Sequence, residues 1–469
     1  MALKVFNSLS GEKEEFIPLK PGEVRMYVCG VTVYDSSHLG HCRFLLTFDL
    51  IYRYLRFCDF RVNYVRNFTD VDDKIIKRAQ EDDVSSDIIT EKYIAEFHRD
   101  AVALGLLEPT HEPRATHHIA EIIELIRRLE ERGLAYRVDG DVFFQVGEFA
   151  GYGKLSGKKI DELEAGARVE VDERKRSPLD FSLWKSSKPG EPTWDSPWGP
   201  GRPGWHIECS AMSTKYLGQP FDIHGGGRDL IFPHHENEIA QSEGAFGRPL
   251  ARYWIHNGFL NINQEKMSKS LGNFYTIHDI LGRVDAAALR HYFLGSHYRS
   301  PMDFSFQGLE EAARGIDRIY ETIDRVERVG GKNDIEPAAA LLDAFRQEMN
   351  DDFNTPRVLA LIFDEVRSLN RLLDEGKTGG VYGRGLALKA VCNVLGLLQD
   401  VPEHFFEKKK ERWLRQHGLS RESVERWIAD RDRARKEKNW ADADRIRHEL
   451  QVKGIVIEDT PGGTLWKVK

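Results

Sequence analysis

The chain has 469 residues, of which 41% are hydrophobic and 30% charged, and its formal net charge is −8. This composition indicates a globular protein with two to four domains of about 100–200 residues each. We expect neither a signal peptide nor a membrane span, because no apolar run is long enough for either. The five cysteines are scattered without a CxxC pair, which argues against a disulfide framework and predicts a cytoplasmic location.

The net charge is unevenly distributed along the sequence. Residues 403–469 hold 17 Lys and Arg against 13 Asp and Glu, a net charge of +4. Because the whole chain carries −8, the preceding 402 residues carry −12. A mildly basic C-terminal segment in an otherwise acidic chain permits contact with a nucleic acid at that segment. Mixed charges of this kind are also typical of solvated helix faces.

The first recognisable unit is a strand, a turn and the start of a helix. Residues 24–28 alternate as on a half-buried strand, Cys29-Gly30 interrupts the alternation, and the letters HLGH follow at 38–41. Apolar residues recur at helical spacing from Phe44 to Leu55, so we expect the helix to begin near Phe44.

A second strand and helix follow at once. Arg61–Asn67 is predicted as a strand, and a helix begins near Asp72 or Asp73. Alternation of strand and helix favours a parallel sheet. Thr116 is expected to be the N-cap of a further helix.

Residues 139–183 contain short strand-like pieces, which indicates an insertion into the sheet domain. It ends in a loop at 185–205 whose five prolines are expected to exclude regular structure. A strand at 221–224 then runs into a glycine-rich turn. Beyond Thr276 the pattern is helical until a small hairpin at 455–469.

His38 and His41 flank Gly40 where a strand leads into a helix. Such junctions bind phosphates in α/β proteins, and the glycine lets the backbone come close to a polyphosphate. The alternative is that both histidines are ordinary residues of a helix start and Cys29 is a buried core thiol.

His234 and Glu238 are four residues apart on a predicted helix, so they project from one face. Cys29 and Cys209 are candidates for further ligands of one ion, and a Cys₂-His-Glu set suits Zn²⁺. The alternative is a solvated helix start, because 180 residues separate the two cysteines.

Lys266 and Lys269 belong to a polar stretch with the letters KMSKS. Two compact ammonium groups can neutralise the oxygens of a departing pyrophosphate. The alternative is an exposed basic loop.

Together these motifs resemble a known family. HLGH is similar to the HIGH signature of class I aminoacyl-tRNA synthetases, and KMSKS matches their second signature letter for letter. Leu39 replaces the isoleucine of the first signature, a volume-conserving change expected to be harmless. Cys29-Gly30 and the segments GWHIECSAM, FDIHGGGRDL and FPHHENEIAQSE resemble the cysteinyl-tRNA synthetases in particular, and the similarity runs the length of the chain.

The resemblance implies a Rossmann-like parallel-sheet catalytic domain with an insertion, followed by an α-helical bundle and a small C-terminal anticodon-binding domain. The catalytic domain would occupy 1–115 and 201–265, interrupted by a connective insertion at 116–200. The KMSKS loop and stem-contact region would span 266–310, the helical bundle 311–400 and the anticodon-binding domain 401–469.

The resemblance also implies roles for individual residues. The zinc ligands would be Cys29, Cys209, His234 and Glu238. The catalytic, ATP-binding residues would be His38, His41, Lys266 and Lys269, with Gly227 and Asp229 beside the adenosine. The cysteine pocket would contain Gly30, Thr32, Thr69 and Trp205, and the anticodon region Arg435, Trp440, Asp444 and Asp459. Trp440 could instead be a core residue of a small helical domain.

The function implied is ATP-dependent ligation of L-cysteine to tRNA(Cys) through a cysteinyl-adenylate. One Zn²⁺ per chain would select the thiol over the serine hydroxyl, so that no editing domain is needed, and Mg²⁺ would accompany ATP. A monomer is expected from the family. The alternative is a cysteine ligase that acts on a small-molecule amine through the same adenylate, but such relatives lack an anticodon module. A catalytically inactive binding protein is disfavoured because both signatures are intact.

Overall fold

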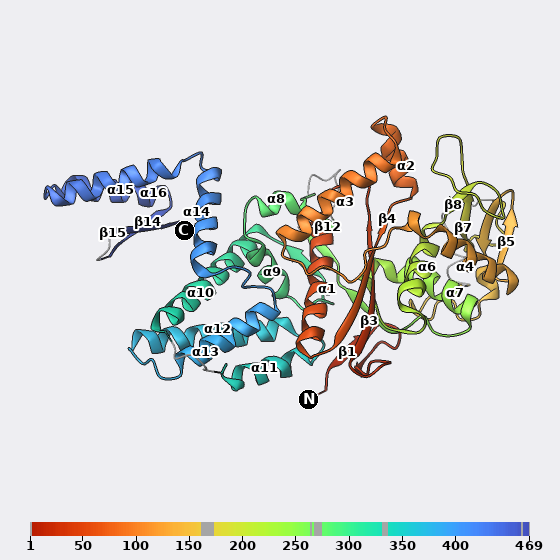
Figure 1. Ribbon diagram of the computed structural model, residues 1–469, viewed down its shortest axis with the longest axis horizontal. Coiled ribbons are helices and arrows are strands. Elements are labelled where there is room, and N and C mark those ends of the chain that lie inside the picture. Colours follow the sequence, from red (N-terminus) through yellow and green to blue (C-terminus); the bar gives the residue numbers. More distant parts are fainter. Residues whose placement is uncertain are drawn as a thin grey trace.

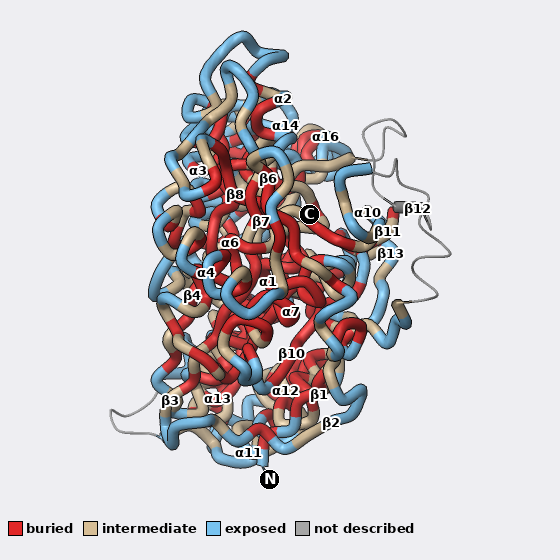
Figure 2. The backbone as a smooth tube through the Cα atoms, turned by 90° about the vertical axis from the view of Figure 1, so that its right-hand side faces the viewer, coloured by how far each residue is buried: buried red, intermediate tan, exposed pale blue. Residues whose placement is uncertain are grey.

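The computed structural model describes residues 2–160, 173–262, 274–330, 336–460 and 463–468, together with the backbone of residues 265–266. The chain forms an elongated molecule in which the parallel sheet lies in the middle, with the insertion on one side of it and the C-terminal helices on the other (Figure 1). Buried residues run through its centre, and exposed residues lie mainly on the outer loops and helix faces (Figure 2). Within the described ranges, no helix combines the length and apolar character needed to cross a bilayer.

The centre of the catalytic region is a four-stranded parallel sheet. Its spatial order is β10 (Ala251–Asn257), β9 (Phe221–Gly227), β3 (Glu23–Thr32) and β4 (Arg61–Thr69). The parallel sheet predicted from the strand–helix alternation is confirmed. Because the chain leaves β3 toward β4 and later returns to β9 on its other side, β3 borders the topological switch point, where α/β proteins bind ligands.

Helix α1 (Leu39–Phe57) packs on this sheet through the apolar face predicted from its spacing. The Phe48 ring fills the space beside Gly225 of β9, where a β-carbon would lie 2.2 Å from it. The helix begins at Leu39 rather than near Phe44, so the predicted start is wrong. The reason is local: the His38 side chain accepts the amide hydrogens of Gly40 and His41, which caps the helix earlier than its apolar pattern suggests.

The next elements are α2 (Asp73–Glu81), α3 (Ser86–Ala103) and α4 (Ile119–Glu131). α2 begins at Asp73, as predicted, and the Asp72 side chain caps it. Thr116 does not cap α4, whose N-cap is His118. Thr116 lies in the 3₁₀ turn Ala115–His117, and its hydroxyl donates to Asp70 at 2.6 Å.

The insertion forms an antiparallel sheet with its own apolar core. The order is β5 (Ala135–Val138), β6 (Asp141–Phe144), β7 (Phe181–Ser186) and β8 (Gly201–Pro203). Regular structure therefore extends into the proline-rich stretch, contrary to our expectation. Pro203 is tolerated because it lies in an edge strand, where its missing N–H is not needed by a further strand.

Two helices complete the catalytic region. They are α6 (Trp205–Leu217) and α7 (Glu236–Phe246), and they pack against each other beside the sheet. A smaller sheet has the order β12 (Glu265–Lys266), β11 (Leu260–Ile262), β13 (Met302–Phe304). Helices α8 (Ile277–Leu281) and α9 (Ala286–Leu294) lie between its strands in sequence, and the hairpin β1 (Lys4–Asn7) and β2 (Glu12–Glu15) starts the chain.

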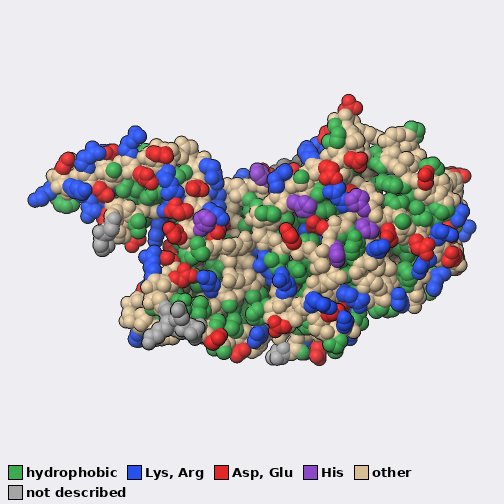
Figure 3. Space-filling model, in the orientation of Figure 1, with side chains coloured by type: hydrophobic (Ala, Val, Ile, Leu, Met, Phe, Trp, Pro, Cys, Tyr) green, Lys and Arg blue, Asp and Glu red, His purple; other side chains and the backbone are tan. Residues whose placement is uncertain are grey.

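The C-terminal part is helical, as predicted. Its first group comprises α10 (Phe306–Val329), α11 (Ala339–Met349), α12 (Thr355–Asp374) and α13 (Val381–Val394). A second group has a separate apolar core and comprises α14 (Pro402–Gln416), α15 (Arg421–Lys436), α16 (Trp440–Val452), β14 (Ile455–Thr460) and β15 (Gly463–Val468). Lys and Arg side chains crowd this second group, the lobe at the left of Figure 3.

Candidate active site and metal centre

The site begins with an irregularity in strand β3. Its register with β4 shifts between Val28 and Val31, so Cys29 and Gly30 lie in a bulge at the carboxyl end of the strand. The Gly30 amide donates to Asn67 Oδ1 at 2.9 Å. A β-carbon on Gly30 would lie 1.6 Å from the Asn67 carbonyl oxygen, so only glycine fits. The interruption seen in the sequence thus presents the Cys29 thiol at the sheet edge.

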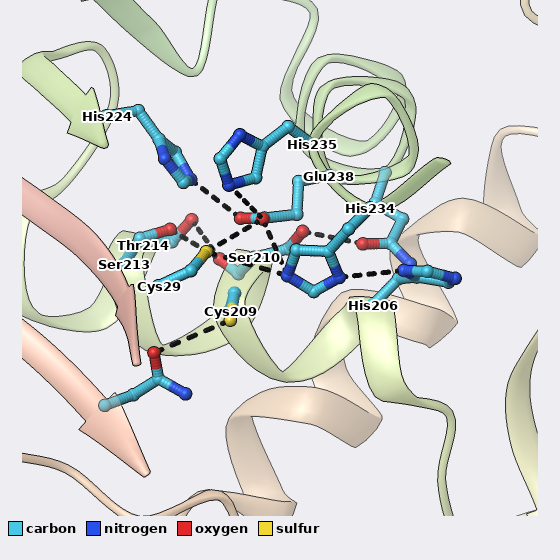
Figure 4. A network of polar contacts seen from close by, with 12 residues as sticks. Cys29, His206, Cys209, Ser210, Ser213, Thr214, His224, His234, His235 and Glu238 are labelled. Carbon is cyan, nitrogen blue, oxygen red and sulfur yellow. Dashed lines mark hydrogen bonds and ion pairs between the residues drawn. The ribbon is translucent and has the colours of Figure 1, made fainter. Parts of the chain in front are cut away.

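A cluster of buried ligand atoms surrounds this thiol (Figure 4). Cys29 Sγ lies 3.3 Å from Glu238 Oε1 and 3.6 Å from His234 Nε2. His234 Nε2 lies 3.1 Å from Glu238 Oε1, and Cys209 Sγ completes a set in which all four atoms are within 4.8 Å of one another. The structure therefore brings together the four residues that the sequence proposed as metal ligands.

These distances fit a tetrahedral zinc ion. With Zn–S bonds of about 2.3 Å and Zn–N or Zn–O bonds of about 2.0 Å, neighbouring ligand atoms of a tetrahedron are about 3.3–3.6 Å apart. The three measured separations fall within about 0.3 Å of that range. All four residues are at most 3% exposed, so an ion held there would be shielded from water.

The electrostatics of the cluster favour the ligand forms of two of its four residues, Cys209 and Glu238. Hydrogen bonding from Cys29 lowers the pKa of the Cys209 thiol to about 6. Burial raises the pKa of Cys29, and the hydrogen bond shared with Cys209 adds to the rise. Despite its burial, the pKa of Glu238 is held well below its usual range by His224 and His234. A thiolate at Cys209 and a carboxylate at Glu238 are thus favoured. Despite burial, Glu238 and Cys209 raise the pKa of His234 to about 10, so a metal ion has to displace a proton from His234 as well as from Cys29.

Two histidines that the sequence analysis did not single out support the cluster. His224 Nε2 lies 2.9 Å from Glu238 Oε2, and His206 Nδ1 lies 2.9 Å from His234 Nδ1. A second possible ligand set combines Cys29, Glu238, His224 and His235. It suits zinc less well, because it offers one sulfur instead of two. Both histidines lie in segments that resemble the family, GWHIECSAM and FDIHGGGRDL. Spacing along the sequence, however, does not predict which residues meet in the folded protein.

The first signature forms the start of α1. His38 and His41 stack with their ring centroids 3.8 Å apart. His38 Nδ1 accepts from the Gly40 and His41 amides, and His41 Nδ1 accepts from the His38 amide. Burial lowers the pKa of His38 to about 4 and that of His41 to about 3. Both rings are therefore neutral at pH 7 and, with Nδ1 accepting, carry their protons on Nε2 as donors.

The second signature is only partly visible. Lys266 is described by its backbone alone, in β12, and Lys269 lies outside the described residues. The described residues that follow pair with the start of α1: the Leu39 amide donates to Tyr275 O at 3.1 Å, and the Ile277 amide donates to Ser37 O at 2.9 Å. Tyr275 and Ile277 therefore lie beside the helix start that bears His38.

Of the proposed cysteine-pocket residues, Trp205 contacts the cluster, and Gly30, Thr32 and Thr69 lie at the carboxyl ends of β3 and β4. Thr32 and Thr69 are direct register partners at the carboxyl ends of β3 and β4. The Trp205 ring is 37% exposed and stacks on His234 with centroids 4.3 Å apart. At the end of β9, the Asp229 carboxylate lies close against the Gly227 Cα. Histidine side chains gather over the central sheet on the face shown in Figure 3.

The four residues proposed for the anticodon region differ in their surroundings. Trp440 begins α16 and is 59% exposed, which contradicts the alternative of a core tryptophan. Asp444 is also exposed. Arg435 and Asp459 instead form an ion pair at 2.8 Å, and Arg431 donates to the same carboxylate. These contacts hold the hairpin to α15.

Comparison with known proteins covers every part of this architecture. Residues 15–314 match the class I tRNA synthetase (C) catalytic domain, residues 344–399 the DALR domain, and residues 419–466 the cysteinyl-tRNA ligase anticodon binding domain. The chain is 56% identical to the cysteine–tRNA ligase of Geobacter metallireducens and 55% identical to that of Geobacter sulfurreducens. Both alignments cover the whole of each chain.

Solved structures show the same fold at low identity. Methionyl-tRNA synthetase of Mycobacterium tuberculosis, in complex with methionyl-adenylate, is similar with a TM-score of 0.59 at 17% identity. The match covers 80% of this chain and 90% of that one. A leucyl-tRNA synthetase of Agrobacterium radiobacter matches with a TM-score of 0.59 at 12% identity, over 81% and 84% of the two chains. From its full-length relatives and its three matched domains, the chain belongs to the cysteinyl-tRNA synthetases of class I.

Proposed function

We propose that this protein ligates L-cysteine to tRNA(Cys) in two steps, with ATP as the source of activation. The observation that carries the proposal is the buried Cys29–Cys209–His234–Glu238 cluster, which lies at the switch point of the sheet. A thiol-selecting metal centre in that position specifies a cysteine substrate more directly than the signatures do, because class I enzymes for other amino acids share those.

In the first step the cysteine carboxylate attacks the α-phosphorus of ATP, and the bond to pyrophosphate breaks. His38 and His41 present two neutral N–H donors at the start of α1, where the helix dipole also favours anions. Lys266 and Lys269 are proposed to neutralise the departing pyrophosphate, and Mg²⁺ would enter with ATP. Gly227 and Asp229 would border the adenosine at the end of β9. The protein contributes mainly positioning and charge stabilisation.

In the second step a sugar hydroxyl of the terminal adenosine of the tRNA attacks the activated carbonyl carbon, and AMP leaves. The C-terminal domain would hold the anticodon end of the same tRNA. Exposed Trp440 is suited to stack on a base, and the basic surface around it to contact phosphates. We retain the domain boundaries given from the sequence, and a monomeric, cytoplasmic enzyme, as parts of this proposal.

The selection of cysteine over serine depends on the cluster. Zn²⁺, when bound by these four residues, would supply a soft Lewis acid that prefers a thiolate to a hydroxyl. We propose that Thr32, Thr69 and Trp205 orient the amino acid; the stacking of Trp205 on His234 supports this role. A pocket based on shape alone discriminates near-isosteres weakly, so the metal makes an editing site unnecessary.

The test is transfer of labelled cysteine to tRNA with and without a zinc chelator. We expect charging that the chelator abolishes and added Zn²⁺ restores. Charging that persists in an enzyme shown to be free of metal would contradict the metal centre. Cysteine-dependent ATP–pyrophosphate exchange without any charging of tRNA would instead favour a ligase that acts on a small amine.

A further inference from the structure

The first helix of the C-terminal lobe, α14, also packs against the body of the molecule. It joins the two parts (Figure 1). Its Trp413 and Leu414 belong to the apolar core of the lobe. Four other residues of the helix contact the body, at positions 405, 409, 412 and 416. Because this spacing places all four on one face of α14, the helix is held along its length.

Two of the four contacts join α14 to α10. The Phe405 ring stacks on the Tyr320 ring with centroids 3.8 Å apart and planes 5° from parallel. The Lys409 ammonium pairs with the Asp317 carboxylate at 2.6 Å. These contacts fix the amino-terminal part of α14 to the first group of C-terminal helices.

The other two contacts reach the turn 282–285, between α8 and α9. The Arg412 guanidinium donates to both carboxylate oxygens of Asp285, each at 2.5 Å, and both side chains are less than one fifth exposed. Gln416 Nε2 donates to the carbonyl oxygens of Gly282 at 2.8 Å and Arg283 at 3.3 Å. A bidentate pair of this kind restricts the relative orientation of its partners, whereas a single exposed ion pair contributes little.

The Asp285 carboxylate makes this contact in place of a local one. Asp285 is the N-cap residue of α9, yet its side chain accepts no hydrogen bond from the first turn of that helix. An aspartate at an N-cap ordinarily accepts from an amide two or three residues further on, which stabilises the helix. Here the carboxylate is bound by an arginine 127 residues later in the chain. The pair therefore serves the contact between lobe and body rather than the start of α9.

The turn 282–285 is fixed on both sides to helix α1, which begins at the proposed ATP site. Before the turn, the Ile277 amide at the start of α8 donates to Ser37 O at 2.9 Å. After it, Arg290 of α9 donates to Asp49 of α1 at 2.5 Å, and both side chains are buried. A tilt of α14 away from this turn would therefore move the lobe relative to α1.

The proposed function requires one tRNA to reach both parts. Its terminal adenosine has to enter the active site while its anticodon is bound by the C-terminal domain. Binding at a second site strengthens binding at the first only if the distance and orientation between the sites fit the ligand. Interfaces between domains of one chain commonly allow relative motion, so a specific contact is needed to hold such a geometry.

We propose that Arg412 and Asp285 form a positioning pair that fixes the C-terminal domain at the spacing that one tRNA(Cys) molecule spans. The inference rests on the proposed function and extends it. The pair strengthens the binding of an RNA that occupies both sites at once, and it does not affect the binding of either end of that RNA alone. Formation of the adenylate, whose chemistry does not involve tRNA, is independent of the pair.

The test measures the dissociation constants of three RNAs with the full-length, zinc-loaded protein: whole tRNA(Cys), a minihelix of its acceptor stem and a stem-loop of its anticodon arm. For Arg412→Ala we expect the Kd of whole tRNA to rise at least tenfold, while the Kd of each fragment stays within twofold. Cysteine-dependent ATP–pyrophosphate exchange should keep its wild-type kcat and KM. The matched control is Arg384→Ala, which removes a bidentate pair with Glu365 inside the helical bundle and should change none of the three constants more than twofold.

A double-mutant cycle tests whether the two residues act as a pair. Asp285→Ala should raise the Kd of whole tRNA as much as Arg412→Ala does. The double variant should bind no more weakly than either single variant, because the same interaction is lost in all three. If Arg412→Ala does not fold, Arg412→Lys keeps the charge but not the planar fork, and should show the same pattern with a smaller rise.

An unchanged Kd of whole tRNA, or additive effects in the double variant, would overturn the proposal. Parallel weakening of the anticodon stem-loop would also overturn it, because Arg412 would then contact the RNA itself. Failure of the wild-type protein to charge tRNA(Cys) with cysteine would refute the proposed function instead, so the two failures are distinguishable.

Discussion

Substitution of Gly30 by alanine tests whether the bulge in β3 sets the geometry of the whole site. The new β-carbon would lie 1.6 Å from the Asn67 carbonyl oxygen, whereas a carbon and a carbonyl oxygen in contact are about 3.3 Å apart. The ends of β3 and β4 must therefore separate by about 1.5 Å or more, because the obstacle is backbone and cannot rotate away. A misplacement of about 1 Å in a catalytic constellation costs about 100-fold in rate.

We expect Gly30→Ala to lower kcat/KM for cysteine in ATP–pyrophosphate exchange about 100-fold. Zinc content should also fall, because Cys29, a proposed zinc ligand, directly precedes Gly30. The control is Gly147→Ala, whose new β-carbon would meet no atom within 4 Å and whose φ is not positive. It should retain wild-type activity and metal. Activity of Gly30→Ala within threefold of wild type, at full zinc content, would refute the argument that this close approach positions the thiol.

Three further predictions concern selectivity, tRNA binding and pH. Serine should support less than about one thousandth of the exchange seen with cysteine, since a hydroxyl binds zinc far less well than a thiolate; equal exchange with both would refute selection by the metal. Trp440→Ala should raise the KM of tRNA about tenfold, by loss of base stacking, without changing tRNA-independent exchange or the melting temperature; a marked fall in melting temperature would show a structural role. Burial lowers the pKa of His41 to about 3, so between pH 7 and 4 the unfolded chain binds a proton that the folded chain does not, and stability falls as pH falls. Thermal melts of His41→Gln should lose less stability than wild type between pH 7 and 5, and parallel curves would contradict that assignment.

The sequence predicted those parts of the fold that depend on local patterns. Alternation in 24–28 and helical spacing in 44–55 identified β3 and the buried face of α1. The (i, i+4) spacing correctly paired His234, in the π-helical turn Ile231–His235, with Glu238 in the first turn of α7. The sequence did not predict the features that depend on helix caps or on contacts between residues distant in the chain. The start of α1 is set by the His38 side chain, Thr116 is held by Asp70, and His224 reaches Glu238 only because β9 pairs with β3. The assignment of Cys29 and Cys209 to one metal site required the resemblance to a family, because a separation of 180 residues in sequence does not predict their distance in space.

Residues that follow the second signature contact residues of the first signature directly. The backbone after the KMSKS stretch pairs with the backbone before α1 through the amides of Leu39 and Ile277, and the Phe274 ring packs edge-on against His38 at 5.3 Å. On its other side the stretch follows β11, which pairs with β13 in a separate small sheet. In the proposed function ATP contacts both signatures. Residues 275–277, which follow the second signature in the chain, are held by these hydrogen bonds at the capped start of α1, next in sequence to the strand whose bulge presents Cys29.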